Sequence, residues 1–577
     1  MKSVFLLPIL SACFVINACS PKNTSAVNPD KAVPVSSAGM MGLCIKNANY
    51  YTQDGALALV DISINNGKIV NIAQHGLCGD NATYKQGIVD LKGAYAYPGF
   101  VDAHAHLLGI GLREMTLNLE GAPSIKALVE TLAQSVAQTP KGETIYGRGW
   151  IETHWPENRF PTRMDLDAVS PDNPVILQRA DGHAIVANSK ALVTAGIDKD
   201  TKAPFGGKIL LGKDGEPTGM LIDKAMSLVT DLLADVTPER RRAAYIKASE
   251  VYAAHGWTGI QSMSVVAEDV DLIAQLSDDG LLKIRVYNAV DMEGADALLD
   301  GIAASGPKTS NNGRVVTRAI KLYADGALGS RGAALLEPYA DEPDNKGLML
   351  TTREKIMPIL ERSLRDGIQI STHAIGDRAN RLVLDWYAEA FAKVPVAERK
   401  FSNPRWRIEH AQILNMADLK RFSELGVIAS MQPSHAIGDL HFAVNRLGVE
   451  RLRGGYAWNS LIESGVKIAA GSDAPVERGD PRIEFYAAVA RKDMKGFSTD
   501  GWYPSEAVSR ERALEMLTAW PAYAAFSEEQ TGLIAIGQNA DFTIFDQDIM
   551  TIDEANILKV KPVMTIVDGE IVYQASP

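Results

Sequence analysis

Long apolar runs are scarce in this 577-residue chain, and none is long enough to cross a bilayer as a helix. Basic runs are also missing, because 58 Lys and Arg residues are spread among 70 Asp and Glu residues. Proteins that bind nucleic acids normally carry a basic patch, so this composition argues against a nucleic-acid partner. A small or neutral partner fits better.

The signatures of several enzyme classes are absent as well. The chain has no Gly-x-x-x-x-Gly-Lys-Ser/Thr loop and no Gly-x-Ser-x-Gly elbow, and Gly206-Gly207 follows no dinucleotide fingerprint. The missing elbow argues against a serine hydrolase. Ordinary apolar and charged fractions, 46% and 22%, indicate a globular protein, and the length predicts one large domain with an insertion or a smaller companion.

The N-terminus has the pattern of an export signal. Lys2 precedes the apolar stretch Val4 to Ile16, and Ile16-Asn17-Ala18-Cys19-Ser20 resembles the lipobox of bacterial lipoproteins. This predicts a signal peptide over residues 1–18, a lipidated Cys19 and a flexible tether to residue 41. An ordinary secretory signal is the alternative, and both predict export. By analogy with Gram-negative lipoproteins, Ser20 favours the outer membrane, facing the periplasm, with the lipid as the only membrane contact.

Two cysteines, Cys44 and Cys78, follow the predicted tether, outside any Cys-x-x-Cys pattern. In an oxidising compartment they can pair as a disulfide. Two separate reduced thiols are the alternative, since the sequence does not give the distance between them.

Short strands mark both ends of the chain beyond the tether. Asn66-Gly67 has the composition of a hairpin turn, and Asp568-Gly569 stands between two apolar segments near the C-terminus. Residues 42–95 and 530–577 therefore predict a small β-sandwich built from both termini. Its strands are expected at Cys44–Asn49, Ala56–Ile64, Lys68–Ile72, Ala540–Phe545, Val563–Val567 and Glu570–Tyr573.

Residues 96–529 alternate apolar strands with helical stretches, which is typical of the α/β class. Eight such strands predict a (β/α)8 TIM-like barrel. The interval of about 108–238 is too long for one crossover, so it predicts an insertion after strand 1 that forms a lid or a substrate wall. The eight strands are expected at 94–106, 258–263, 284–290, 319–325, 368–373, 406–410, 427–431 and 466–473.

Histidine and aspartate residues fall at the ends of these strands. His104 and His106 stand one residue apart, so the two-residue period of a strand turns both to one face. His373, His410 and Asp473 end three later strands. Because the carboxyl ends of barrel strands meet at one mouth, we expect these five side chains to lie together. Imidazole and carboxylate groups at one point predict a divalent metal, with zinc favoured.

From Gly42 onward the chain resembles the metal-dependent amidohydrolase superfamily, through Pro98-Gly99-Phe100-Val101-Asp102-Ala103-His104-Ala105-His106, Ser371-Thr372-His373, Ile408-Glu409-His410 and Gly471-Ser472-Asp473. Within it, the long insertion and the segments Gly147-Arg148-Gly149-Trp150, Ile320–Arg331 and His373–Asp377 resemble the amidohydrolase family 3 branch, which includes N-substituted formamide deformylases.

The resemblance implies a role for each strand-end residue. His104 and His106 would hold the more buried ion together with Asp473, and His373 and His410 would hold a second ion. A bound cation lowers the pKa of its water and polarises a carbonyl oxygen. Asp473 is the expected general base, which takes a proton from the attacking water and returns it to the departing nitrogen. A pure ligand role for Asp473 is the alternative.

Lys321, on the fourth expected strand, matches the lysine that superfamily members often carboxylate with carbon dioxide. Its carbamate would bridge two ions, whereas an unmodified ammonium would repel a metal. The alternative is an ion pair with Asp325 or another carboxylate, and the site then holds one ion. Asp102 is expected to orient a histidine rather than to bind metal.

Residues outside the strand ends are candidate substrate contacts. Trp150, with Arg148 before it and Trp155 after it, is a candidate wall for an apolar or aromatic group, and core packing is the alternative. His183 in the insertion and His435 just beyond the seventh strand are placed to reach the mouth.

The sequence therefore predicts an exported metal-dependent hydrolase of non-peptide C–N bonds in a small amide or formamide. A deaminase on the same scaffold is the nearest alternative, and a non-catalytic binding lipoprotein is the second. The sequence leaves open the substrate, the identity and number of the metal ions, and a homodimeric state.

Overall fold

The computed structural model describes residues 42–74, 76–79, 84–152, 155–179, 184–204, 207–230, 232–233, 236–498 and 501–576. The signal, lipidation and tether predictions for residues 1–41 lie outside this part of the chain. Among the described helices, none combines the length and apolar character that a membrane span requires.

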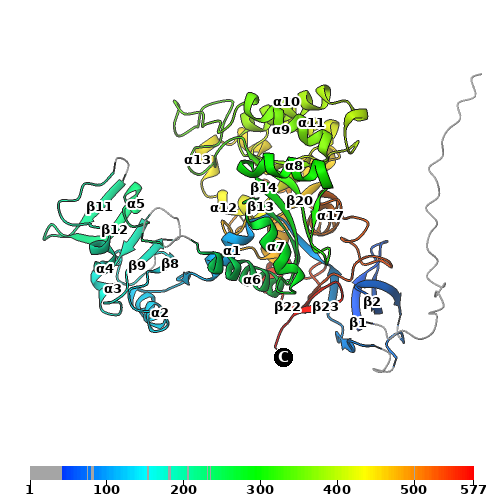
Figure 1. The fold of residues 1–577 in the computed structure, drawn as a ribbon, viewed down its shortest axis with the longest axis horizontal. Helices are drawn as coiled ribbons and strands as arrows, with labels where there is room; N and C mark the ends of the chain where they lie inside the picture. Colours follow the sequence, from blue (N-terminus) through cyan, green and yellow to red (C-terminus); the bar gives the residue numbers. More distant parts are fainter. Residues whose placement is uncertain are drawn as a thin grey trace, which may run out of the picture. The chain divides into compact units, whose positions relative to one another are not determined.

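Eight parallel strands form a nearly closed barrel, which confirms the predicted architecture (Figure 1). The first and last strands meet where Asp473 N donates to His104 O at 2.6 Å and His106 N donates to Ala474 O at 2.8 Å. In sheet order the strands are β6 (Phe100–Ala105), β13 (Trp257–Val265), β14 (Arg285–Asp291), β16 (Val315–Tyr323), β17 (Gln369–Ala374), β18 (Arg407–His410), β19 (Ile428–Met431) and β20 (Ile468–Ala470); the short β15 (Lys308–Thr309) pairs with β16.

Helices alternate with these strands, and capping residues stand where a helix begins and ends. In α6 (Pro238–His255), Thr237 caps the first turn by accepting from Arg240 N, and Gly256 ends the helix in the left-handed region at φ 104°. The other helices of this part are α7 (Asp269–Asp278), α8 (Ala295–Ser305), α9 (Arg353–Asp366), α10 (Asp377–Lys393), α11 (Leu419–Leu425), α12 (Pro433–Asp439), α13 (Ala443–Leu447), α14 (Trp458–Glu463), α15 (Pro481–Ala490), α16 (Arg510–Leu517) and α17 (Ala519–Ala524).

The expected first strand, 94–106, is in fact two strands separated by Gly99. The first, β5 (Tyr95–Pro98), belongs to the terminal sheet, and β6 belongs to the barrel. A Cβ atom at Gly99 would lie 2.3 Å from Thr258 Oγ1, so only glycine fits this close approach. An unbroken apolar pattern cannot reveal that the chain changes sheets here.

Both ends of the described chain contribute to one eight-stranded sheet. Strand β21 (Phe542–Phe545) pairs antiparallel with β5, which joins C-terminal strands to N-terminal ones (Figure 1). The order is β23-β22-β21-β5-β1-β2-β3, with β4 paired to β1, and side chains of both halves share one core. A two-layer sandwich stays a prediction. The remaining strands are β1 (Leu43–Tyr51), β2 (Leu57–Asn65), β3 (Lys68–Ala73), β4 (Ile88–Asp90), β22 (Pro562–Val567) and β23 (Glu570–Gln574).

Covalent and ionic links support this sheet. Cys44 and Cys78 form a disulfide, which decides between the two states that the sequence left open. Arg285 of barrel strand β14 binds Asp541 through two contacts of 2.6 and 3.0 Å, and Arg314 binds Asp568 at 2.7 Å. The terminal sheet is therefore tied to the barrel by partly buried ion pairs.

Between β6 and β13 the chain forms a second, six-stranded sheet with helices of its own. Helix α1 (Leu107–Glu114) packs closely on α6, since a Cβ atom at Gly111 would lie 1.8 Å from Ala244 O. The new sheet begins after α1, in the order β11-β12-β10-β9-β8-β7. Its elements are β7 (Leu117–Asn118), α2 (Ile125–Gln138), β8 (Ile145–Trp150), α3 (Arg163–Asp167), β9 (Val175–Arg179), β10 (Ala184–Ala187), α4 (Ser189–Thr194), β11 (Gly207–Leu211), β12 (Pro217–Asp223) and α5 (Ser227–Thr230).

Gly471 lies where the barrel closes, and its substitution tests the importance of that contact. A Cβ atom there would lie 2.3 Å from His104 N, so we expect Gly471→Ala to destabilise the protein by about 1–3 kcal/mol. Thermal unfolding measures the effect. The control is Gly301→Ala in α8, where a Cβ atom would meet nothing within 4 Å. Equal melting temperatures for Gly471→Ala and the parent protein would contradict the prediction.

Candidate metal centre

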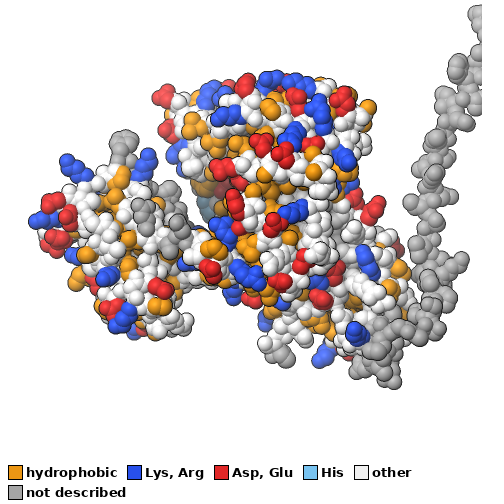
Figure 2. Space-filling model, in the orientation of Figure 1, with side chains coloured by type: hydrophobic (Ala, Val, Ile, Leu, Met, Phe, Trp, Pro, Cys, Tyr) orange, Lys and Arg blue, Asp and Glu red, His pale blue; other side chains and the backbone are white. Residues whose placement is uncertain are grey.

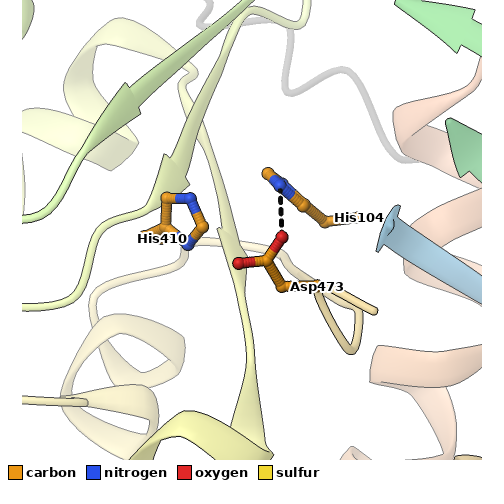
Figure 3. Close-up of side chains that lie close together, drawn as sticks. All are labelled: His104, His410 and Asp473. Carbon is orange, nitrogen blue, oxygen red and sulfur yellow. Dashed lines mark ion pairs between the residues drawn. The ribbon is translucent and has the colours of Figure 1, made fainter. Parts of the chain in front are cut away.

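Three buried side chains from distant strands meet at one end of the barrel. His104 lies on β6, His410 ends β18 and Asp473 follows β20. One potential ligand atom of each lies within 4.8 Å of the others. Figure 3 shows the two imidazoles and the carboxylate together, with His104 Nε2 at 3.4 Å from Asp473 Oδ1.

The other three predicted ligands surround this group. His106 Nε2 lies 3.1 Å from Asp473 Oδ1, and Lys321 Nζ lies 3.4 Å from His104 Nε2. The ring of His373 lies 4.5 Å from that of His410, centroid to centroid. The structure therefore brings all six residues together, although His410 groups with His104 and Asp473 rather than with His373 alone.

In three of the four histidines, the ring nitrogen Nδ1 contacts an oxygen atom outside this cluster. His104 Nδ1 lies 2.6 Å from Glu409 Oε2, and His106 Nδ1 lies 3.2 Å from Met263 O. His410 Nδ1 lies 2.7 Å from Gln432 Oε1. Such contacts place the hydrogen on Nδ1 and leave the Nε2 lone pair for a cation. The donor set thus fits a divalent metal of the zinc type.

Glu409 is held by a fully buried ion pair that the sequence reasoning missed. Arg407 Nε lies 2.7 Å from Glu409 Oε1, and neither side chain is exposed. Arg407 also donates to Ala103 O at 2.6 Å and to Ser430 Oγ at 2.7 Å. Burial opposes ionisation of Glu409, but Arg407 and His104 hold its pKa well below the usual range. Arg407 and Glu409 are two apart on β18, a spacing that predicts a shared inward face.

The backbone is strained at two of the ligands. His410 has φ 73° and Asp473 has φ 59°, both in the left-handed region. Non-glycine residues held there cost about 1–3 kcal/mol each, and such outliers concentrate at functional sites. The hydrogen bonds around the barrel mouth hold both residues in this conformation.

The electrostatics of the cluster favour neutral bases beside one carboxylate. Burial, with the nearby Lys321, lowers the pKa of His373 to about 3, and burial lowers the pKa of His410 well below its ordinary value. Burial also lowers the pKa of Lys321. Burial disfavours the ionised form of Asp473, yet hydrogen bonds with His104 and His106 hold its pKa far below the usual range. Metal binding needs neutral imidazoles and an ionised carboxylate.

Among the residues that the structure describes, Lys321 forms no ion pair with Asp325 or another carboxylate, which was the alternative. Asp325 instead accepts hydrogen bonds from the backbone N–H groups of Ala334, Ile375 and Gly376, at 2.8, 2.9 and 2.8 Å. The amine of Lys321 faces His104 Nε2 at 3.4 Å, and a carbamate on it would supply anionic oxygens to a cation.

Asp102 supports the backbone rather than a histidine ring, which corrects the sequence expectation. Its carboxylate accepts from Ser472 N at 2.9 Å, Ser472 Oγ at 2.6 Å and Tyr252 OH at 3.0 Å. It also accepts from the backbone N–H of His104 at 3.2 Å. It therefore holds together the strand ends that carry His104 and Asp473.

The candidate substrate contacts differ in whether they reach the barrel mouth. His435, in α12, reaches the mouth: its Nε2 lies 3.6 Å from Asp473 Oδ2 and has no hydrogen-bond partner among the described residues. Trp150 does not reach the mouth, because it is fully buried in the core of the insertion, where its indole N–H donates to Leu177 O at 2.9 Å. Trp155 is buried in the same core. His183 lies outside the described residues.

The sequence profile of the amidohydrolase family matches residues 87–573. YtcJ of Bacillus subtilis (strain 168), named provisionally as an amidohydrolase, is 32% identical over 493 residues, which cover 85% of this chain and 90% of that protein. The N-substituted formamide deformylase of Arthrobacter pascens is 27% identical and covers 93% and 99%. The crystal structure of an uncharacterized metal-dependent hydrolase from Pyrococcus furiosus is 28% identical, with TM-score 0.69, over 88% of this chain and 100% of that one.

The contact between Glu409 and His104 predicts a measurable loss on substitution. Glu409→Gln leaves Arg407 without a counter-ion, so we expect a destabilisation of about 3–5 kcal/mol. Weaker orientation of His104 should also lower metal affinity about 10- to 100-fold. Thermal unfolding and calorimetric titration of the metal-free protein measure the two effects.

The control for this substitution is Glu515→Gln, which removes a charge from a solvent-exposed pair with Arg512. It should change neither quantity. Unaltered metal affinity in Glu409→Gln would show that Glu409 does not orient His104.

Proposed function

Because this chain belongs to the amidohydrolase family, we propose that it hydrolyses a non-peptide C–N bond in a small amide or formamide. The observation that carries this proposal is the convergence of His104, His410 and Asp473 at the barrel mouth. The deformylase of Arthrobacter pascens, similar over nearly its whole length, supports the choice of bond.

A divalent cation held by these residues would lower the pKa of water and polarise the substrate carbonyl. The two oxygens of Asp473 have different surroundings. Oδ1 faces His104 and His106, while Oδ2 faces His435. Asp473 would take a proton from the attacking water and deliver it to the departing nitrogen. His435, whose Nε2 has no partner in the described part of the chain, would contact the substrate.

We also propose that the protein is exported and held at the outer membrane by a lipid on Cys19. The lipobox-like segment Ile16-Asn17-Ala18-Cys19-Ser20 supports this. The disulfide between Cys44 and Cys78 is a second support, because such bonds persist mainly in oxidising compartments. Figure 2 shows acidic and basic side chains interspersed on the face in view, and we propose a small-molecule rather than a nucleic-acid partner.

Removal of the metal tests the proposed chemistry. Chelation should abolish hydrolysis of N-formyl, N-acyl and cyclic amides, and added zinc should restore it, since water alone barely attacks an amide. Chromatography should detect an amine and a carboxylic acid as products, or a single ring-opened amino acid from a cyclic amide. Release of ammonia without a carboxylic acid would identify a deaminase. Less than one equivalent of bound metal, with no turnover of any substrate, would rule out the hydrolase.

Substitution of Lys321 tests for the carbamate. Lys321→Ala should abolish activity and lower the number of metal ions bound, because the bridging anion is lost. Short carboxylic acids should restore part of the activity and part of the metal binding. Kinetics and metal analysis measure the two effects. The control is Lys467→Ala, an exposed residue just before β20, at the opposite end of that strand from Asp473. Full activity in Lys321→Ala would exclude the bridge.

A further inference from the structure

A cleft of about 660 Å3 lies beside the segment that follows Asp473. Its lining includes residues 475–478 together with Glu120 and Arg148 of the insertion. Pro475 touches the start of α1, since a Cβ atom at Gly109 would lie 3.0 Å from it and 3.7 Å from His106 Cβ. The cleft therefore borders the chain segments that carry two of the proposed metal ligands. Its volume suits a small organic molecule.

Most charged groups that line this cleft are already engaged. Arg113 binds Glu114 at 2.9 Å and donates to the carbonyl oxygens of Glu477 and Arg478 at 2.7 and 3.0 Å. Arg478 forms an ion pair with Glu120. Burial raises the pKa of the Glu477 carboxyl.

Among the arginines in this lining, Arg148 is the one without such a contact in the described part of the chain. Its guanidinium is half-buried and forms no hydrogen bond or ion pair with any residue that the structure describes. Its backbone is nevertheless firmly placed, because it pairs with Asn118 of β7 and accepts from Leu119 N at 2.8 Å. The next residue, Gly149, has φ 107°, and a Cβ atom there would lie 2.9 Å from Glu120 N. The strand thus presents to the cleft a guanidinium that makes no hydrogen bond or ion pair with the described residues.

We propose that Arg148 binds a carboxylate on the part of the substrate that does not react, so that the preferred substrates are amides bearing a carboxylate. A guanidinium binds a carboxylate through two parallel hydrogen bonds, which gives orientation as well as affinity. This goes beyond the apolar or aromatic wall that the sequence predicts around Trp150, which is buried elsewhere. The choice of an amide rests on the proposed function, whereas the binding of the carboxylate does not.

Two pairs of compounds that differ only by a carboxylate test the proposal. N-methanesulfonylphenylalanine and N-methanesulfonylphenethylamine are not hydrolysed and report binding to the metal-loaded protein by calorimetry. N-formylphenylalanine and N-formylphenethylamine report turnover. The parent protein should bind the carboxylate-bearing sulfonamide more tightly than its partner, and Arg148→Gln should weaken only that compound, about 10- to 100-fold.

In turnover, Arg148→Gln should raise KM for N-formylphenylalanine by a similar factor, with kcat nearly unchanged and N-formylphenethylamine unaffected. Arg148→Lys should retain part of the preference, since it keeps the charge but not the paired hydrogen bonds. The control is Lys126→Gln, which removes one positive charge from an exposed position of the same insertion and should change nothing.

Absence of a preference for the carboxylate in the parent protein, or an equal preference in Arg148→Gln, would overturn the proposal. A preference that depends on Arg148, without hydrolysis of either formyl compound, would leave this inference standing and contradict the proposed hydrolysis instead.

Discussion

The buried ion pair between Arg407 and Glu409 is the constraint on which the candidate metal centre depends. Two charges without solvent contact are costly, so each needs several partners. Arg407 obtains them from Ala103 O, Ser430 Oγ and Gln261 Oε1, which lie on three other barrel strands. Glu409 then contacts His104 Nδ1. The ion pair between Arg407 and Glu409 in the barrel interior thereby determines which ring nitrogen of His104 faces the mouth.

The neighbouring ligands are positioned by similar means. Gln432, immediately before α12, engages His410, and His435 in the first turn of the same helix faces Asp473. Asp102 ties the backbone of His104 to that of Ser472, next to Asp473. These contacts hold His410 and Asp473 in left-handed conformations that an isolated chain would avoid. The strain is offset by the packing of the surrounding strands.

Several elements could be predicted because they depend on local pattern. Apolar strands at regular intervals predict a barrel, and polar residues at strand ends predict one mouth. The break at Gly99 could not be predicted, because it arises from the close approach of Thr258, which is distant in sequence. For Trp150 the sequence left open a pocket wall and core packing, because an indole suits both, and only the structure places it in the core. Glu409 stands next to His410 in the sequence, yet its role depends on His104, which is 305 residues away.

By itself, the sequence determined which residue types stand at the strand ends and therefore the class of chemistry, because hydrophobic periodicity and ligand type are properties of short segments. The tertiary structure decided which of those residues meet, which nitrogen of His104 and of His410 points inward, and which charges in the cleft remain without partners. These outcomes depend on contacts between segments hundreds of residues apart. Only the closed barrel, with its buried charges balanced, brings such segments together.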